Sequence, residues 1–86
     1  INDLTKNLKE KNFSEVRKWV NTNMDNDTSL LFRRIYDSLY ETVVVSSIPA
    51  AVLVLAKYQF QVAFVADQEI NMLACLTELM VECEFK

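Results

Sequence analysis

The chain of 86 residues contains no glycine and one proline, and this composition restricts its possible folds more than any other feature. Glycine is the residue that most readily adopts positive φ, which the tight turns of β-hairpins need. Helices joined by short polar loops avoid that need. Because 51% of the residues are hydrophobic, the chain can also bury a modest core. We therefore expect a single all-α domain over residues 1–86.

Hydrophobic side chains recur at helical spacing in five segments, which polar residues separate. We expect helices over Ile1–Lys11, from Phe13 to about Asn23, from Asp27 or Thr28 to about Val44, from Ser46–Pro49 to Val62 or Ala63, and from Asp67 to about Glu84. Asn12 and Glu15 have the spacing of a capping box at the start of the second helix. The predicted architecture is a compact five-helix bundle.

The last two predicted helices lie in Ser47–Phe85, and we expect them to fold back on each other with the rest of the chain packed around them. The polar residues of the fourth helix are Lys57, Gln59 and Gln61, so this helix is predicted to be buried on most sides. On the second and fifth helices, the expected inward residues are Phe13, Val16, Val20, Ile70, Leu73, Leu76, Leu79, Met80 and Cys83, and the expected outward residues of the fifth are Asn71, Glu78 and Glu82.

The chain has two cysteines, Cys75 and Cys83, which lie eight residues apart on the fifth predicted helix. This separation along the helix axis is too long for a disulfide between them. We therefore expect two buried thiols, as in a protein of a reducing cytoplasm.

The sequence lacks the residue types of the common catalytic sites. It contains no histidine, so histidine-dependent catalysis and histidine-containing zinc sites are excluded, and without glycine it has no P-loop or dinucleotide-binding motif. Its net charge of −3 argues against a nucleic-acid-binding surface on this domain alone. Solvated helix faces are the expected positions of Arg33, Arg34, Glu78, Glu82 and Glu84. We expect this chain to be no enzyme and to contain no catalytic, cofactor-binding or metal-binding residue.

Aromatic residues on the third and fourth predicted helices are candidates for an oligomer interface. They are Phe32, Tyr36, Tyr40, Tyr58, Phe60 and Phe64. Two interpretations are open: packing in the core of a small bundle, or contact between subunits, for which the polar tip of tyrosine is well suited. Residues 42–66 contain one charge, at Lys57, but Pro49 and polar residues interrupt them, so a bundle core is favoured over a membrane span.

Three segments together resemble the C-terminal collar domain of clamp-loader ATPase subunits, the small subunits of the replication factor C family, in the version of T-even-type phages. The segments are INDLTKNLKEKNFSEVRKWV, LLFRRIYDSLYETV, and KYQFQVAFVADQEINMLACLTEL followed by VECEFK. The resemblance covers essentially the whole chain and consists of apolar patterns. One departure is Val65, which stands where cellular relatives often carry a glycine.

The resemblance implies a role in DNA replication. In that family a collar domain follows an N-terminal AAA+ ATPase module, and collars pack in a ring that holds the subunits together. The chain, which starts at Ile1, would then be the C-terminal part of a longer subunit. The ATPase module would bind ATP and magnesium, the sliding clamp and primer–template DNA. The expected location is the cytoplasm, which is that of an infected bacterial host if the protein is from a phage. The alternative hypothesis is an unrelated helical interaction module that binds a partner helix in an apolar groove.

Overall fold

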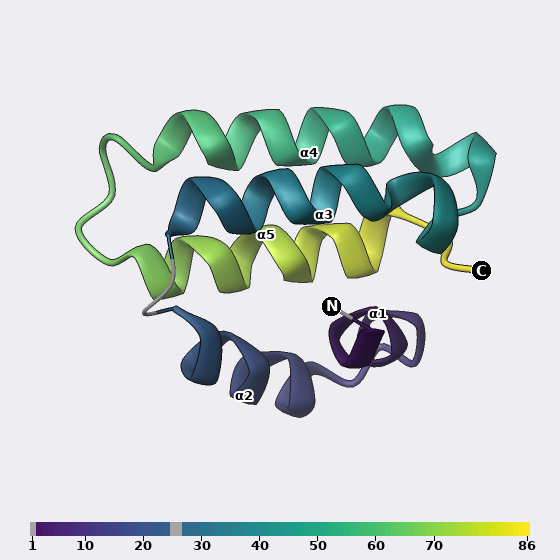
Figure 1. The fold of residues 1–86 in the computed structure, drawn as a ribbon, viewed down its shortest axis with the longest axis horizontal. Coiled ribbons are helices and arrows are strands. Elements are labelled where there is room, and N and C mark those ends of the chain that lie inside the picture. Colours follow the sequence, from purple (N-terminus) through teal and green to yellow (C-terminus); the bar gives the residue numbers. More distant parts are fainter. Residues whose placement is uncertain (1, 25–26) are drawn as a thin grey trace.

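The computed structural model describes residues 2–24 and 27–86, which form five α-helices and no β-strand. The helices are α1 (Asn2–Lys9), α2 (Phe13–Asn23), α3 (Thr28–Thr42), α4 (Ile48–Gln61) and α5 (Gln68–Glu82), with a short 3₁₀ turn, η1 (Val45–Ser47), before α4 (Figure 1). The predicted all-α fold is confirmed. The expectation for Ile1 lies outside the described residues.

The helices are arranged around an antiparallel α4–α5 hairpin, as expected for the last two helices. α4 lies along one edge of the molecule, α3 packs against it, and α1 and α2 pack against α5 on the far side (Figure 1). α4 therefore has neighbours on one half of its circumference. Its other half faces away from the bundle.

Aspartate and asparagine side chains fix the starts of three helices. Asp27 Oδ1 accepts the backbone N–H groups of Ser29 and Leu30, at 2.9 and 3.3 Å. Asp67 Oδ1 accepts those of Glu69 and Ile70 in the same way, at 2.9 and 3.2 Å. Such caps satisfy amide donors that have no partner within the helix.

The predicted capping box at the start of α2 forms only in part. Asn12 Oδ1 accepts the Glu15 N–H at 3.3 Å, as expected. The Asn12 N–H does not bond to the Glu15 carboxylate, because it donates to the Asn7 carbonyl at 2.9 Å. Glu15 instead pairs with Lys18 at 3.2 Å.

A Schellman motif ends α1 without glycine. The Asn12 N–H reaches the Asn7 carbonyl at 2.9 Å and the Lys11 N–H reaches the Leu8 carbonyl at 3.1 Å, which is the bond pattern of that motif. The motif needs a left-handed residue, and Lys11 supplies it with φ of 55°. Lys11 is the sole residue with positive φ in the described part of the chain, so the turn at Val65 is made without one.

The C-terminal residues tie the end of α5 to the end of α3. Val43 and Phe85 form an antiparallel β-bridge. The Val44 N–H donates to the Glu84 carbonyl at 2.9 Å, and the Lys86 N–H donates to the Thr42 carbonyl at 3.0 Å. This pairing joins the residues just before α4 to the residues just after α5, so it links the two ends of the segment that forms the α4–α5 hairpin.

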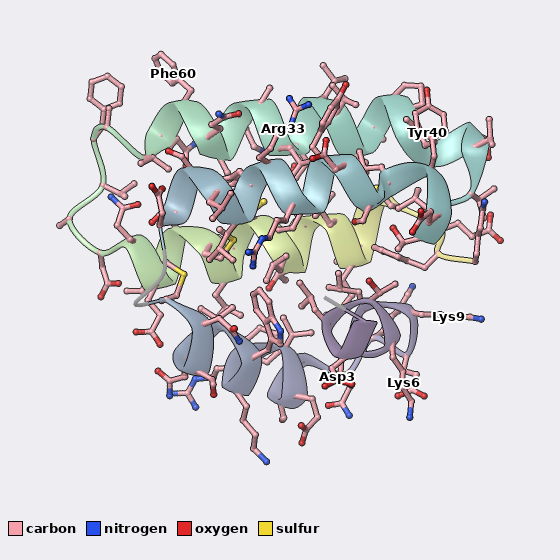
Figure 2. All side chains as sticks on the ribbon, in the orientation of Figure 1. Asp3, Lys6, Lys9, Arg33, Tyr40 and Phe60 are labelled. Carbon is pink, nitrogen blue, oxygen red and sulfur yellow. The ribbon has the colours of Figure 1, made fainter. Side chains whose placement is uncertain are left out.

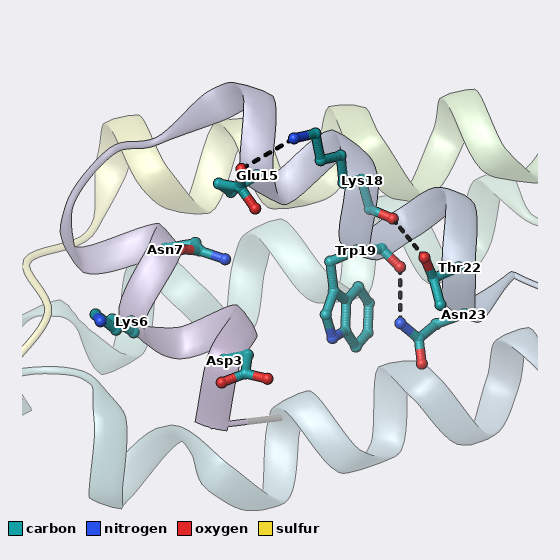
Figure 3. A pocket seen from close by; sticks show the side chains of 8 residues that line it. All are labelled: Asp3, Lys6, Asn7, Glu15, Lys18, Trp19, Thr22 and Asn23. Carbon is teal, nitrogen blue, oxygen red and sulfur yellow. Dashed lines mark hydrogen bonds and ion pairs between the residues drawn. The ribbon is translucent and has the colours of Figure 1, made fainter.

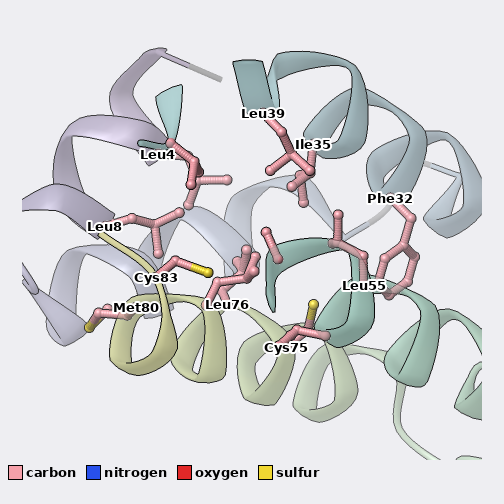
Figure 4. Packing of buried hydrophobic residues seen from close by; sticks show 14 of the residues in the cluster. Leu4, Leu8, Phe32, Ile35, Leu39, Leu55, Cys75, Leu76, Met80 and Cys83 are labelled. Carbon is pink, nitrogen blue, oxygen red and sulfur yellow. The ribbon is translucent and has the colours of Figure 1, made fainter. Parts of the chain in front are cut away.

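A single hydrophobic core joins all five helices (Figure 4). Its fully buried members include Leu4, Val16, Val20, Val43, Met72, Cys75, Leu76 and Leu79. Both cysteines are buried and unpaired, which confirms the expected thiols, and burial raises the pKa of Cys75 to about 12.

Two neighbouring positions on α5 were predicted the wrong way round. Asn71, expected outward, is 5% exposed, and its Nδ2 donates to the Tyr58 carbonyl of α4 at 3.1 Å. Ile70, expected inward, is 66% exposed. The reason is that α4 lies against the side of α5 that carries Asn71, whereas the side that carries Ile70 faces away from the bundle. Phe13, also expected inward, is 46% exposed.

Candidate interaction surfaces

The aromatic candidates divide between core and surface. Phe32 is buried, Tyr58 is half-buried, and Tyr36, Tyr40, Phe60 and Phe64 are exposed. Packing in the core is therefore the correct interpretation for Phe32 and the wrong one for the four exposed residues. Subunit contact remains the prediction for those four. Figure 2 shows Phe60 and Tyr40 at opposite ends of the molecule, both pointing outward.

The outer half of α4 carries an apolar ridge. The α4 ridge consists of Pro49, Leu53, Ala56, Phe60 and, just beyond the helix, Phe64. These residues follow one another at spacings of three or four, so they share one side of the helix. Leu53 and Phe60 are 72% and 70% exposed, and the ring centroids of Phe60 and Phe64 are 5.2 Å apart. The prediction that α4 is buried on most sides is therefore wrong.

Beside the ridge, the exposed surface of α4 extends to the neighbouring helix, α3. A groove of about 240 Å³ lies between the two helices, and its lining includes Tyr36 of α3 and Val52 of α4. The Arg33 guanidinium carbon lies 5.2 Å from the centre of the Tyr36 ring, a cation–π arrangement, and its Nε lies 3.1 Å from Asp37 Oδ1. Arg33 is exposed, as expected for a solvated helix face.

A second apolar surface lies on the outer side of α5. This α5 groove has a volume of about 490 Å³ and is lined by Phe13, Tyr58, Ile70, Leu73, Ala74, Thr77, Glu78 and Val81. Ile70 and Val81, one at each end of α5, are 66% and 67% exposed. Sequence analysis missed this surface. The available signal was the apolar row Ile70, Ala74 and Val81, which repeats at helical spacing on the side opposite the core.

A small polar cluster joins α4 to α5 between the ridge and the α5 groove. Lys57 Nζ lies 2.7 and 2.8 Å from the two carboxylate oxygens of Glu78, and the Tyr58 hydroxyl donates to Glu78 Oε1 at 2.8 Å. The Lys57 hydrogen bond, followed by the Tyr58 hydrogen bond, lowers the pKa of Glu78. Burial and the bond to Glu78 raise the pKa of Tyr58 to about 12. Glu78, expected on a solvated helix face, has a side chain that is 30% exposed and pairs with Lys57 of the neighbouring helix.

A polar groove of about 540 Å³ lies between α1 and α2 (Figure 3). Two hydrogen bonds of its lining end on backbone carbonyls of α2: Thr22 Oγ1 donates to the Lys18 carbonyl at 3.0 Å, and Asn23 Nδ2 donates to the Trp19 carbonyl at 2.7 Å. Lys18 Nζ also donates to Glu15 Oε1 at 3.2 Å. The Thr22 and Asn23 side chains therefore bond to backbone groups within the last turns of α2. The groove's volume alone does not make it a better candidate than the apolar surfaces.

The exposed apolar side chains do not result from a loosely folded chain. The accessible surface is 5317 Å², and a compact protein of 10.0 kDa is expected to have about 5,200 Å². The bundle is therefore as compact as expected for its size, and the α4 ridge and the α5 groove lie on its outer surface.

No protein-family model matches this chain, and no curated protein matches it either. Within residues 2–24 and 27–86, no group of three or more side chains could hold a metal ion. The helices of that same part are too short or too polar to cross a membrane.

Proposed function

We propose that the chain is an oligomerisation module, the collar domain of a sliding-clamp loader subunit in DNA replication. The observation that supports this proposal is the α4 ridge. A helix that is apolar on most sides is normally covered on most sides, yet half of α4 is open to solvent. A neighbouring subunit would supply the missing cover, and the resemblance to clamp-loader collars supplies the kind of assembly.

In this proposal the chain performs no catalysis. Its partners are the collars of other subunits, and a separate AAA+ module of the same subunit binds ATP and magnesium, grips the sliding clamp and contacts primer–template DNA. The net charge of −3 fits a domain that holds such a ring together without touching DNA.

The expected strength of one contact is modest. Burying three large side chains such as Leu53, Phe60 and Phe64 contributes about 5–9 kcal/mol in total, at about 1.5–3 kcal/mol each. Association itself costs about 4–15 kcal/mol. The two are comparable, so we expect the isolated chain to associate weakly and a closed ring to be stabilised by several such contacts.

The test is light scattering coupled to size-exclusion chromatography over a wide range of concentration. The wild-type mass should rise with concentration above that of the monomer. The double variant Leu53→Glu/Phe60→Glu should stay monomeric, because each change places a charge in the centre of the contact. The matched control is Leu30→Glu, which changes an exposed leucine of α3 that does not belong to the α4 ridge and should associate like the wild type.

The α5 groove supports the alternative function, an interaction module that binds a partner helix of another protein. The coding sequence upstream of Ile1 separates the two. A P-loop motif and an acidic Walker-B strand there would support the collar, because they belong to an AAA+ module. An upstream sequence without them would favour the interaction module.

A further inference from the structure

We propose that residues 83–86, which follow α5, form a strap that opens as one unit while the helices stay folded. The strap lies beside the end of α3, where the yellow C-terminal segment meets the teal end of that helix (Figure 1). The movement takes place within one copy of the chain. The proposal therefore goes beyond the proposed function and does not depend on association between copies.

The backbone bonds of the strap use groups that no helix needs. The Glu84 carbonyl accepts the Val44 N–H at 2.9 Å, and the Lys86 N–H donates to the Thr42 carbonyl at 3.0 Å. Thr42 is the last residue of α3, so its carbonyl has no acceptor role within the helix, and Val44 lies beyond the helix end. Both bonds can therefore break without the loss of a helical hydrogen bond.

Phe85 anchors the middle of the strap. Its side chain is half-buried against the core, in a socket lined by Leu4 and Leu8 of α1, Leu39 of α3 and Leu79 of α5. The space left in the socket is about 10 Å³, close to the least that can hold a water molecule, so Phe85 fills it. Because backbone bonds lie on both sides of this one side chain, withdrawal of Phe85 should release both of them together.

The strap is held less firmly than the helix that it follows. Its remaining bonds, from the Glu84 N–H to Ser47 Oγ at 3.0 Å and from Lys86 Nζ to the Tyr40 carbonyl at 2.8 Å, are exposed to water. Leu76 of α5, in contrast, is fully buried. Segments with solvent-exposed hydrogen bonds and few buried apolar contacts open at a lower free energy than the core. We therefore expect the strap to open far more often than α5 unfolds.

Opening changes the apolar surface at the end of α3. Val43, which is 0% exposed and faces Phe85 in the β-bridge, becomes accessible together with the socket. The α4 ridge is unaffected, because none of its residues lines the socket. The strap thus gives the molecule a second folded form, in which an additional apolar site is open.

The first test is amide hydrogen exchange of the full chain, followed by NMR at a series of urea concentrations below the unfolding transition. The Val44, Glu84 and Lys86 amides should give one common free energy of opening, lower than that of the Leu76 amide. Urea should accelerate exchange at Leu76 steeply and at the three strap amides very little, because opening of the strap exposes little surface.

Two results would overturn the proposal. Strap amides that follow the urea dependence of the Leu76 amide would show that the strap opens only when the whole protein unfolds. Three different free energies of opening would show that the segment frays residue by residue and is not one unit.

The variant Leu76→Ala separates the two kinds of opening a second time. It should accelerate exchange of the α5 core amides by about 30-fold or more, and leave the strap amides unchanged, because it weakens the core and not the strap. Equal acceleration of both sets would contradict the proposal. If this variant does not fold, the urea series on the wild type decides the matter alone.

The two buried cysteines provide a readout without NMR. Cys83 is the first residue of the strap, and its Sγ lies 3.9 Å from the Ser47 carbonyl, whereas Cys75 is 0% exposed within α5 (Figure 4). Alkylation by iodoacetamide, mapped by mass spectrometry, should modify Cys83 through strap opening and Cys75 only through unfolding of the bundle. Equal rates at both thiols would count against the strap.

Phe85→Ala tests the anchor itself. It empties the socket, so alkylation of Cys83 should become about tenfold faster. The matched control is Phe64→Ala, which removes the same ring from a position that is 73% exposed and outside the strap, and should leave the rate as in the wild type. A Phe85→Ala chain that is alkylated at the wild-type rate would show that Phe85 does not hold the strap closed.

Discussion

Lys11 shows how a single residue takes a role that glycine usually has. Its φ of 55° lies in the left-handed region, where a Cβ atom is unfavourable. The surrounding bonds from Lys11 and Asn12 to the last carbonyls of α1 hold it there. The sequence could not reveal this position, since a chain without glycine gives no residue that marks a left-handed cap.

Lys11→Gly should therefore stabilise the protein. Relief of the strained backbone gains about 1–2 kcal/mol, and the greater freedom of glycine in the unfolded chain costs about 0.4–1 kcal/mol. The net increase in the free energy of unfolding should be about 0.5–1 kcal/mol in urea titration. Lys11→Ala keeps the Cβ atom and removes the charge, so it should give no such increase. Equal gains in both variants would trace the effect to charge and not to the backbone.

Glu78 links the stability of the α4–α5 hairpin to pH. Its pKa is lower in the folded protein than the ordinary value of 4.5, so its contribution is complete above about pH 4.5 and is lost as pH falls through the folded pKa. Tyr58 acts in the opposite range. Its pKa rises from 10.0 to about 12, so its contribution is present below pH 10 and is lost as pH rises toward 12.

Glu78→Gln should flatten the acid side of the stability profile, as measured by urea midpoints at neutral pH and at several values below about pH 5. Lys57→Gln removes the partner that lowers the pKa most but leaves the Tyr58 hydrogen bond, so it should flatten the profile by a smaller amount. The double variant should add little to Glu78→Gln alone, because both changes act on one ion pair. Independent, additive effects would contradict that pairing.

At the scale of the element, helical periodicity located every helix but not every buried face. The five helices begin and end close to the predicted residues because caps such as Asp27 and Asp67 are visible in the sequence. Periodicity failed on α4 and α5, which carry apolar residues nearly all round. In such a helix the pattern cannot tell the side that faces a neighbour in the same chain from the side left open, as Ile70 and Leu53 show.

α3 offers a test of how far the contact surface extends beyond the ridge. Tyr36 and Tyr40 are 47% and 71% exposed, so Tyr36→Glu/Tyr40→Glu should leave the helicity seen by circular dichroism intact. If these tyrosines belong to the subunit contact, self-association should be abolished in light scattering. Unchanged self-association would limit the contact to the α4 ridge, and loss of the fold would show that the tyrosines are needed for packing.

At the scale of the whole molecule, the fold class and the helix order were predictable, and the candidate surfaces were predictable only in part. Phe60 and Phe64 were selected as aromatic residues on an apolar helix, and they lie on the ridge. The α5 groove was not foreseen, because it depends on which sides of α5 the other helices cover. That packing is decided by contacts among all the helices and not by any one segment.

Two leucines should separate the stability of the core from association between copies. Leu76 is fully buried, so Leu76→Ala should lower the free energy of unfolding by about 2–5 kcal/mol. Leu53 is 72% exposed, so Leu53→Ala should change it by about 0.5 kcal/mol or less while weakening self-association. Urea titration of dilute protein measures the first effect and light scattering the second. A large loss of stability in Leu53→Ala would place that residue in the core.

The pairing of residues 84–86 with the end of α3 implies an order of events during folding. Closing a flexible loop between Val43 and Phe85 costs about 3 kcal/mol of chain entropy, and two backbone hydrogen bonds return about 2 kcal/mol. The pairing therefore cannot form first, because the helices between those residues must already have shortened the loop. During synthesis on the ribosome, the Thr42 carbonyl can accept the Lys86 N–H only after the whole α4–α5 hairpin has emerged and folded. Formation of the β-bridge therefore marks the end of folding of this hairpin.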